Sequence, residues 1–353
     1  MKINQAELTN YRNHKHILLD FPENITLIIG QNGSGKTNIV EALNLIATGK
    51  PFRAEFDQDA INHNASKTTV KAAITGKGET KIGISIERSL RIPNGATKTI
   101  KINGKSARVR ALAEITNTVL FSPLDMSLLA NGPSDRRRFI DNILSQSDRK
   151  YNKLNSEYTK ARRQRNKVLE TIRETSQGYM QLKYWNDKIL EAGHYIQNER
   201  KKLFKHLNDN INNKIEQIEP NLRAKIQYIE NQITPERLTE YQPKEIAACT
   251  TLIGPHRDDF AFVTDYKGKE LNMGRFFSRG QQRTLIVSLK MCELKFLGYS
   301  LGEKPVLLLD DVFSELDKNH RSAMEEIVQD QQTILTATEI PAGLKNINTI
   351  FLN

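Results

Sequence analysis

Three short segments, far apart in the chain, carry residues that could bind and hydrolyse a nucleoside triphosphate. The first is Gly30–Thr37, which reads Gly-Gln-Asn-Gly-Ser-Gly-Lys-Thr and matches the phosphate-loop pattern G-x-x-x-x-G-K-[ST] in full. Its glycines allow backbone N–H groups to converge on the β- and γ-phosphates, Lys36 adds a positive charge, and the Thr37 hydroxyl can ligate Mg²⁺. We therefore predict an ATP site made by Gly30, Gln31, Asn32, Gly33, Ser34, Gly35, Lys36 and Thr37.

The second segment is an acidic pair that follows the apolar run Val306–Leu309. Such a run predicts a buried strand that delivers Asp310 beside the phosphate loop, where Asp310 would hold Mg²⁺ together with Thr37. Asp311 would then orient or deprotonate the attacking water, and its short side chain predicts slow hydrolysis. Alone, this pattern more often marks a strand that ends at a turn, but the earlier phosphate loop favours catalysis. The candidate catalytic residues are Lys36, Asp310 and Asp311.

The third segment, Ser278–Arg283, reads Ser-Arg-Gly-Gln-Gln-Arg and precedes a predicted helix over 284–296. A serine, a glycine and the amides of a helix N-terminus can form an anion site, although an ordinary helix cap explains the same residues. Because the chain already holds one phosphate loop, we predict that this segment faces ATP held by a second copy. ATP would join two copies, and hydrolysis would release them. The residues predicted to act in this way are Ser278, Gly280 and Gln281.

Positive charge is concentrated in one part of the chain. The formal net charge is +11, and residues 136–205 contain eighteen Lys or Arg against eight Asp or Glu. A local excess of this size indicates a polyanionic partner, with DNA first and anionic lipid second, whereas a merely solvated helical face is the alternative. No spacing typical of base-specific readers is present. The candidate DNA-binding residues are Arg136, Arg137, Arg138, Arg162, Arg163 and Arg165.

The elements that must position these residues follow the order of an α/β ATPase. The apolar run 25–29 predicts a strand before the phosphate loop, and 38–47 has the spacing of a helix after it. Residues 68–103 predict antiparallel strands that lead to a hairpin at Asn103-Gly104. Further strands are expected at 306–309 and 333–335, with a helix at 320–328 between them.

Residues 151–203 change to a heptad pattern. Two seams, over 151–172 and 182–203, are separated by Ser176–Gly178, which predicts a short antiparallel helical hairpin. A helix of about 25 residues would be about 38 Å long. The aromatic residues on or beside the seams could stack on bases, but core packing is the better interpretation; they are Tyr151, Tyr158, Tyr184 and Trp185. The predicted domains are 1–125 and 251–353 for the head, and 126–250 for a basic helical lobe.

Other features limit the class of protein. Two cysteines cannot make a disulfide framework, and no apolar leader or run of about 20 apolar residues occurs, so we expect a cytoplasmic protein without a membrane span. His256 with Asp258 and Asp259 could serve metal or acid–base chemistry, but a hydrogen-bonded loop histidine is the better interpretation. Arg12 and Arg53 could approach the nucleotide or DNA, but surface ion pairing is the better interpretation.

The motifs together carry a resemblance to a known group. Gly30–Thr37, Ser278–Gln282, Leu307–Asp311 and Ser314–Asp317 resemble the ABC-type ATPase heads of the SMC and DNA-repair group. Further motifs extend this over nearly the whole chain and are similar to the RecF family of bacterial recombination mediators; they are Tyr11–Asn13, Phe121–Asp125, Arg136–Asp141 and Gly254–Asp259.

The resemblance implies an ABC head, a P-loop NTPase with a mixed sheet, that carries an inserted helical lobe. It implies weak, DNA-stimulated ATP hydrolysis, an ATP-dependent homodimer with Asp317 across its interface, DNA binding, recombinase loading at gaps, and work with RecO and RecR. Two departures stand out: Arg279 replaces the usual glycine, and Thr338 stands near the position of an expected switch histidine.

Two other functions remain open from the sequence. The nucleotide motifs also suit the ATPase subunit of a membrane transporter, although a basic helical lobe does not suit a compact transport engine. The chain could also be an ATP-binding scaffold that contacts DNA only incidentally. Steep salt dependence of DNA affinity would argue against the scaffold.

Overall fold

The computed structural model describes residues 1–353 apart from Glu23, Lys77, 90–94, Lys267, 314–315, Ala342 and Asn353. The chain forms two compact units, one of residues 1–125, 217–220 and 286–353, the other of residues 126–216 and 221–285. The sequence predicts a return to the head at 251, whereas residues 251–285 group with the helical unit. The reason is that the buried carboxylate of Asp258 accepts hydrogen bonds from Arg200 Nη1 (2.7 Å) and Gln197 Nε2 (3.0 Å) of that unit.

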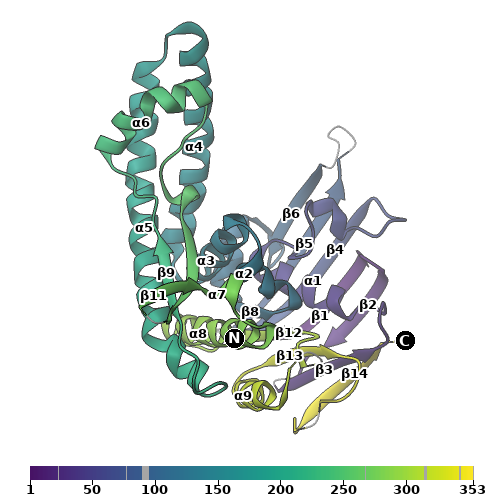
Figure 1. Ribbon diagram of the computed structural model, residues 1–353. Helices are drawn as coiled ribbons and strands as arrows, with labels where there is room; N and C mark the ends of the chain where they lie inside the picture. The colour runs from purple at the N-terminus through teal and green to yellow at the C-terminus, as the bar shows by residue number, and fades with distance from the viewer. Residues whose placement is uncertain are drawn as a thin grey trace. The chain divides into compact units, whose positions relative to one another are not determined.

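The first unit contains a parallel sheet of strand order β14-β3-β13-β12-β8 (Figure 1). Every neighbouring pair is parallel, so the carboxyl ends of all five strands share one edge. Central strands β12 and β13 are buried throughout, as their apolar sequences predict. The strands are β3 Ile25–Gly30, β8 Thr118–Phe121, β12 Val306–Asp310, β13 Thr333–Ala337 and β14 Ile347–Leu352. Helices α1 Lys36–Thr48 and α9 Lys318–Val328 follow β3 and β12 in the sequence.

A six-stranded antiparallel sheet completes this unit, in the order β2-β1-β4-β5-β6-β7. Its strands alternate between buried and exposed residues, so one face packs into a core shared with α1 and the other faces solvent. Ile102 pairs with Lys105, and the positive φ angles of Asn103 (48°) and Gly104 (78°) fit the two-residue turn that the sequence predicts. The strands are β1 Lys2–Tyr11, β2 His14–Asp20, β4 Lys67–Thr75, β5 Glu79–Arg88, β6 Ala96–Ile102 and β7 Lys105–Ala107.

The second unit is built around a long helical hairpin (Figure 1). Helix α4, Arg149–Thr175, packs against α5, Tyr179–Glu216, and the buried positions include most of both predicted seams. The break falls at Ser176 and Gly178, which have left-handed φ angles of 56° and 109°. Helix α5 has 38 residues, which makes it about 57 Å long and longer than the sequence indicates.

Shorter elements surround the hairpin. Helices α3 Pro133–Ser147 and α6 Pro235–Ala248 pack on α4, and a three-stranded sheet has the order β11-β10-β9. Its strands are β9 Lys225–Ile229, β10 Asp259–Tyr266 and β11 Lys269–Asn272. Helix α8 is Arg279–Leu301, of which residues 279–285 group with the second unit and residues 286–301 with the first. The remaining turns are α2 Ser127–Ala130, α7 Met273–Phe276, η1 Asp57–Ala60, η2 Val109–Glu114, η3 Pro123–Met126 and η4 Pro255–Arg257. Within the described residues, every helix is too short or too polar to cross a bilayer.

Candidate functional site

The phosphate loop links β3 to α1 at the carboxyl edge of the parallel sheet. Gly35 has a φ angle of 99°, a left-handed conformation that favours glycine. A Cβ atom there would lie 2.4 Å from His14 Nε2 and 2.5 Å from Asn13 Oδ1, so these side chains would also have to move. Lys36 Nζ donates to the carbonyl oxygens of Gly30 (2.5 Å) and Gln31 (3.0 Å). The lysine therefore lies folded over the loop that it is predicted to serve.

The two residues predicted to hold Mg²⁺ are in direct contact. Thr37 Oγ1 donates to Asp310 Oδ1 at 2.8 Å, although 273 positions separate them in the sequence. Asp310 ends β12 and is only 4% exposed. Burial raises the pKa of its carboxyl, and the hydrogen bonds from Thr37 and Thr336 act against that rise. The structure thus brings together the phosphate loop and the acidic strand end.

Thr336 is a residue of this site that the sequence analysis did not assign. It lies on β13, between β3 and β12, and its hydroxyl donates to Asp310 Oδ1 at 3.1 Å and accepts from the Asp311 amide at 2.9 Å. Asp311 has a left-handed φ angle of 51°, which is uncommon outside glycine and is typical of functional turns. Thr338, predicted near the switch position, follows the strand and is exposed. A polar residue at the carboxyl end of a buried parallel strand was the available signal for Thr336.

The loop and its acidic partner suit a triphosphate with Mg²⁺. Ser34 Oγ is buried without a hydrogen-bond partner among the described residues, so the loop retains an unused donor. Mg²⁺ is commonly held by one or two carboxylates together with substrate phosphates and waters. Asp310 and Thr37 would provide the protein ligands of such a Mg²⁺ ion, and phosphates and waters would complete its coordination. No cluster of three His, Cys, Asp or Glu that could hold a metal by itself occurs in the described part of the chain.

Two arginines lie beside the loop. Arg12 makes a bidentate ion pair with the buried Glu41, at 2.8 Å and 2.9 Å, as expected of an ion-pairing residue. The Arg53 amide donates to the same carboxylate at 3.0 Å, and its guanidinium reaches Asn38 Oδ1 at 3.5 Å. The charge of Arg53 also lowers the pKa of Asp310, which places it near the predicted Mg²⁺ ligands.

The predicted signature segment forms the N-terminus of α8. The Gln281 amide donates to Ser278 Oγ at 3.3 Å, and the Ser278 amide donates to Gln281 Oε1 at 3.1 Å, which is a capping box. Ser278 and Gly280 are exposed, and a Cβ atom at Gly280 would meet only Ser278 Oγ, at 3.8 Å. The segment is therefore both a helix cap and an open surface.

The last predicted motif is only partly described. Ser314 and Glu315 lie outside the described residues. Asp317 caps α9, because its Oδ1 accepts from the amides of Asn319 (3.0 Å) and His320 (3.1 Å). Its side chain is 66% exposed, so it remains accessible to a partner.

The structure corrects the prediction for Arg165. Its side chain is 0% exposed and pairs with the equally buried Glu245 at 2.5 Å. The guanidinium also donates to Asn186 Oδ1 (2.7 Å) and Thr251 Oγ1 (3.0 Å). A side chain enclosed in this way holds α4 to α6 and cannot reach a DNA phosphate.

The other predicted DNA-binding arginines divide into two groups. Arg136 makes a bidentate ion pair with Asp259, at 2.6 Å and 2.9 Å, and its side chain is 14% exposed, so its charge is already used within the lobe. Arg137 is half-buried and donates to the Asp258 carbonyl at 3.0 Å. Within the described structure, no carboxylate pairs with the remaining three, of which Arg138 and Arg163 are exposed and Arg162 is half-buried.

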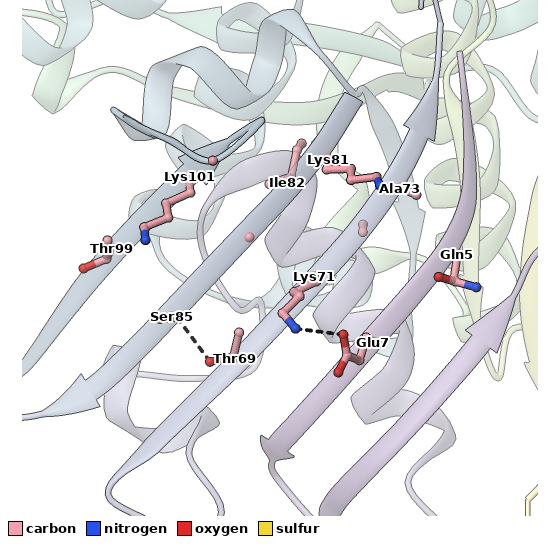
Figure 2. Close-up of a pocket in the computed structure, with 13 residues that line it drawn as sticks. Gln5, Glu7, Thr69, Lys71, Ala73, Lys81, Ile82, Ser85, Thr99 and Lys101 are labelled. Carbon is pink, nitrogen blue, oxygen red and sulfur yellow. Dashed lines mark hydrogen bonds and ion pairs between the residues drawn. The ribbon is translucent and has the colours of Figure 1, made fainter. Parts of the chain in front are cut away.

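A second group of basic residues, on the antiparallel sheet, was not predicted from the sequence. A hollow of about 470 Å³ lies over the solvent face of the antiparallel sheet, and Ala73 and Gly83 are among the residues that line it. Figure 2 shows the strands and several of the side chains around it. Lysines from three strands line it, and Lys71 pairs with Glu7 at 2.9 Å. These lysines, Lys71, Lys81 and Lys101, are too far apart in the sequence to form a recognisable charge cluster.

Comparison with known proteins identifies the family. Residues 2–340 match the family described as RecF/RecN/SMC N terminal domain. A protein named DNA replication and repair protein RecF, from Natranaerobius thermophilus, is 33% identical over 361 residues, which cover 96% of this chain and 92% of the relative. A protein of the same name from Acetivibrio thermocellus is 34% identical over 96% of this chain and 94% of its own length.

Solved structures agree with the sequence relatives. A structure described as the recombination mediator protein RecF-ATP in the RecFOR pathway superposes with a TM-score of 0.86 at 29% identity, over 97% of this chain and 93% of that one. An Smc head domain from Pyrococcus furiosus has a TM-score of 0.53 at 17% identity, over 96% and 89%, and supports the fold alone. The predicted ATPase-head fold with an inserted helical lobe is confirmed.

Proposed function

The chain belongs to the RecF/RecN/SMC N-terminal domain family, and from this premise we propose that it is an ATP-dependent DNA-binding protein of recombinational repair and replication. The observation that carries the proposal is the 2.8 Å contact between Thr37 and Asp310, which unites the phosphate loop with the acidic strand end. Relatives named for DNA replication and repair, and a similar RecF structure described with ATP, support it.

The chemistry at this site follows from its side chains. Loop amides and Lys36 would hold the triphosphate, while Thr37 and Asp310 would hold Mg²⁺, which neutralises phosphate charge. Asp311 would orient the attacking water, and the hydrogen bond from its amide to Thr336 fixes the turn that carries it. Because an aspartate is shorter than a glutamate, we expect weak ATP hydrolysis that DNA stimulates.

We also propose that the complete site needs two copies of the chain. Ser278, Gly280 and Gln281 lie at an open helix N-terminus, which suits contact with ATP held by the second copy. ATP would then close a head-to-tail dimer on DNA, with Asp317 across the interface, and hydrolysis would open it. In this role the protein would work in the cytoplasm with RecR and RecO to load recombinase at gaps.

Light scattering with and without MgATP tests this proposal. Wild-type protein should change from monomer to dimer on MgATP, and Lys36→Met should remain monomeric because the loop loses its phosphate-binding charge. Asp311→Asn should still bind ATP and should accumulate as the dimer, because only the hydrolytic step is impaired. A Lys36→Met protein that dimerises with MgATP as the wild type does would refute the scheme.

A further inference from the structure

The segment Gly254–Asp259, which resembles a motif of the family, has no task in the proposed function. Its histidine is fully engaged: His256 Nε2 donates to the Thr251 carbonyl at 3.0 Å, and Nδ1 accepts from the Tyr158 hydroxyl at 2.7 Å. Burial is the main cause that lowers the pKa of His256 to about 3, so the imidazole is neutral at physiological pH. With both ring nitrogens occupied, His256 is suited neither to metal binding nor to proton transfer.

Three arginines from different elements converge on this histidine. Arg257 follows it in the chain and is exposed. Arg162 lies one turn of α4 beyond Tyr158, the hydrogen-bond partner of His256, and Arg137 of α3 donates to the Asp258 carbonyl at 3.0 Å. The charges of all three contribute to the low pKa of His256, as expected if they surround one point of the lobe.

The acidic residues of the same motif make no direct ion pair with these arginines. Asp259 is bound in a bidentate pair by Arg136, and the buried Asp258 pairs with Arg200 at 2.7 Å. None of Arg137, Arg162 and Arg257 has a carboxylate within ion-pair distance among the residues that the structure describes. The charges of Asp259, Asp141 and Asp258 act on Arg137 without forming a direct ion pair with it. Neighbouring like charges repel one another, so arginines without a direct ion-pair partner favour binding of an anion.

The surroundings favour a long polyanion over a single small ion. The cluster is open to solvent at Arg257, and α4 continues it with exposed basic residues at one-turn spacing. These residues, Lys160, Arg163 and Lys167, also lack carboxylate partners within the described ranges. Repeated phosphates match such a row, whereas a free phosphate ion would leave most of it unused.

We propose that Arg137, Arg162 and Arg257 bind phosphates of a nucleic-acid backbone and so place DNA on the helical lobe. This inference rests on the proposed DNA-binding function and locates its contact. On this proposal the Gly254–Asp259 segment positions Arg257 beside α4 and α3. The uncharged His256 holds the segment to α4 through its hydrogen bond with Tyr158.

Fluorescence anisotropy of full-length protein with a labelled 30-base-pair duplex tests the proposal, across a salt series and without nucleotide. Arg162→Gln and Arg257→Gln should each weaken binding roughly fivefold and should lower the slope of log affinity against log salt by about 0.9. Arg257→Lys should retain the slope. The matched control is Lys205→Gln, which removes the same charge from α5, where Lys205 pairs with Asp209 at 2.7 Å, and should change neither quantity.

The outcomes separate this proposal from the proposed function. If wild-type protein shows no salt-dependent DNA binding, the DNA function itself fails. If wild-type protein binds but both glutamine variants keep its affinity and slope, the cluster is not the DNA contact although the function stands. If the variants bind DNA normally but lose MgATP-driven dimerisation in light scattering, the cluster serves another phosphate and the inference is overturned.

Discussion

At the scale of single residues, burial of Asp310 at the proposed Mg²⁺ site costs stability in the nucleotide-free protein, and ligand binding would relieve that cost. Asp310 is 4% exposed, and burial raises the pKa of its carboxyl, so the ionised form is less stable in the folded protein than in the unfolded chain. Two hydroxyl donors, Thr37 and Thr336, offset only part of that cost. A bound cation would reverse the balance, because it favours the ionised carboxylate.

Asp310→Asn should therefore stabilise the nucleotide-free protein and remove its response to MgATP. A stability gain of about 1 kcal/mol would raise Tm by roughly 2–4 °C near neutral pH. Because the folded pKa is raised, the penalty is present at neutral pH and disappears as pH falls through that pKa, so the gain should shrink in acid. Thermal unfolding from pH 7 to pH 4 measures this.

The control for Asp310→Asn is Asp317→Asn, because the pKa of Asp317 is lowered whereas that of Asp310 is raised. Hydrogen bonds from the backbone and side chain of His320 lower the pKa of the exposed Asp317, so its ionised form favours folding above the unfolded pKa and loses that effect in acid. Asp317→Asn should leave the Tm at pH 7 unchanged or lower it. If Asp310→Asn lowers Tm at pH 7 without nucleotide, burial of the charge is not the dominant effect at this site.

At the scale of elements, the buried Arg165–Glu245 pair joins α4 to α6. Arg165→Ala should cost about 3–5 kcal/mol in the free energy of unfolding, because it leaves Glu245 charged and enclosed. Arg163→Ala, two positions earlier and exposed, should change stability by less than about 0.5 kcal/mol. Urea unfolding compares the two. The double variant Arg165→Met with Glu245→Leu should recover much of the loss, and an Arg165→Ala protein as stable as wild type would contradict this assignment.

The same helix shows which features of the chain could be predicted. The heptad seam of α4 and the strands beside the phosphate loop follow from local periodicity, and the sequence predicts them well. Local pattern also places Arg165 on the seam, yet its charge suggests a DNA contact. Its partner Glu245 lies 80 positions away and has no signal of its own, so only the structure reveals the pair. The Thr336 contact with Asp310 was missed although Thr336 is a polar residue at a buried strand end, because strand order decides that β13 lies beside β12.

At the scale of the whole molecule, the decisive question is whether one ATP site is shared between two copies. The phosphate loop belongs to the first compact unit, and the Ser278 signature to the second. A head-to-tail dimer would have two equivalent sites, each with a loop from one copy and a signature from the other. Variants that damage only the loop or only the signature should then complement each other.

Mixing Lys36→Met protein with Ser278→Arg protein tests this sharing. Each variant alone should be nearly inactive, since both of its sites lack one part. In a mixed dimer, the intact loop of the Ser278→Arg copy meets the intact signature of the Lys36→Met copy, which restores one site. Each mixed dimer has one complete site of two, so it should show about half of the ATPase activity of a wild-type dimer if the sites act independently. The control is wild type mixed with the double variant Lys36→Met/Ser278→Arg. Each site of that mixed dimer combines one intact part with one damaged part, so the mixed dimer should be inactive. If the two single variants stay inactive together while light scattering shows that they associate, each copy must hold a complete site, and the shared-site proposal fails.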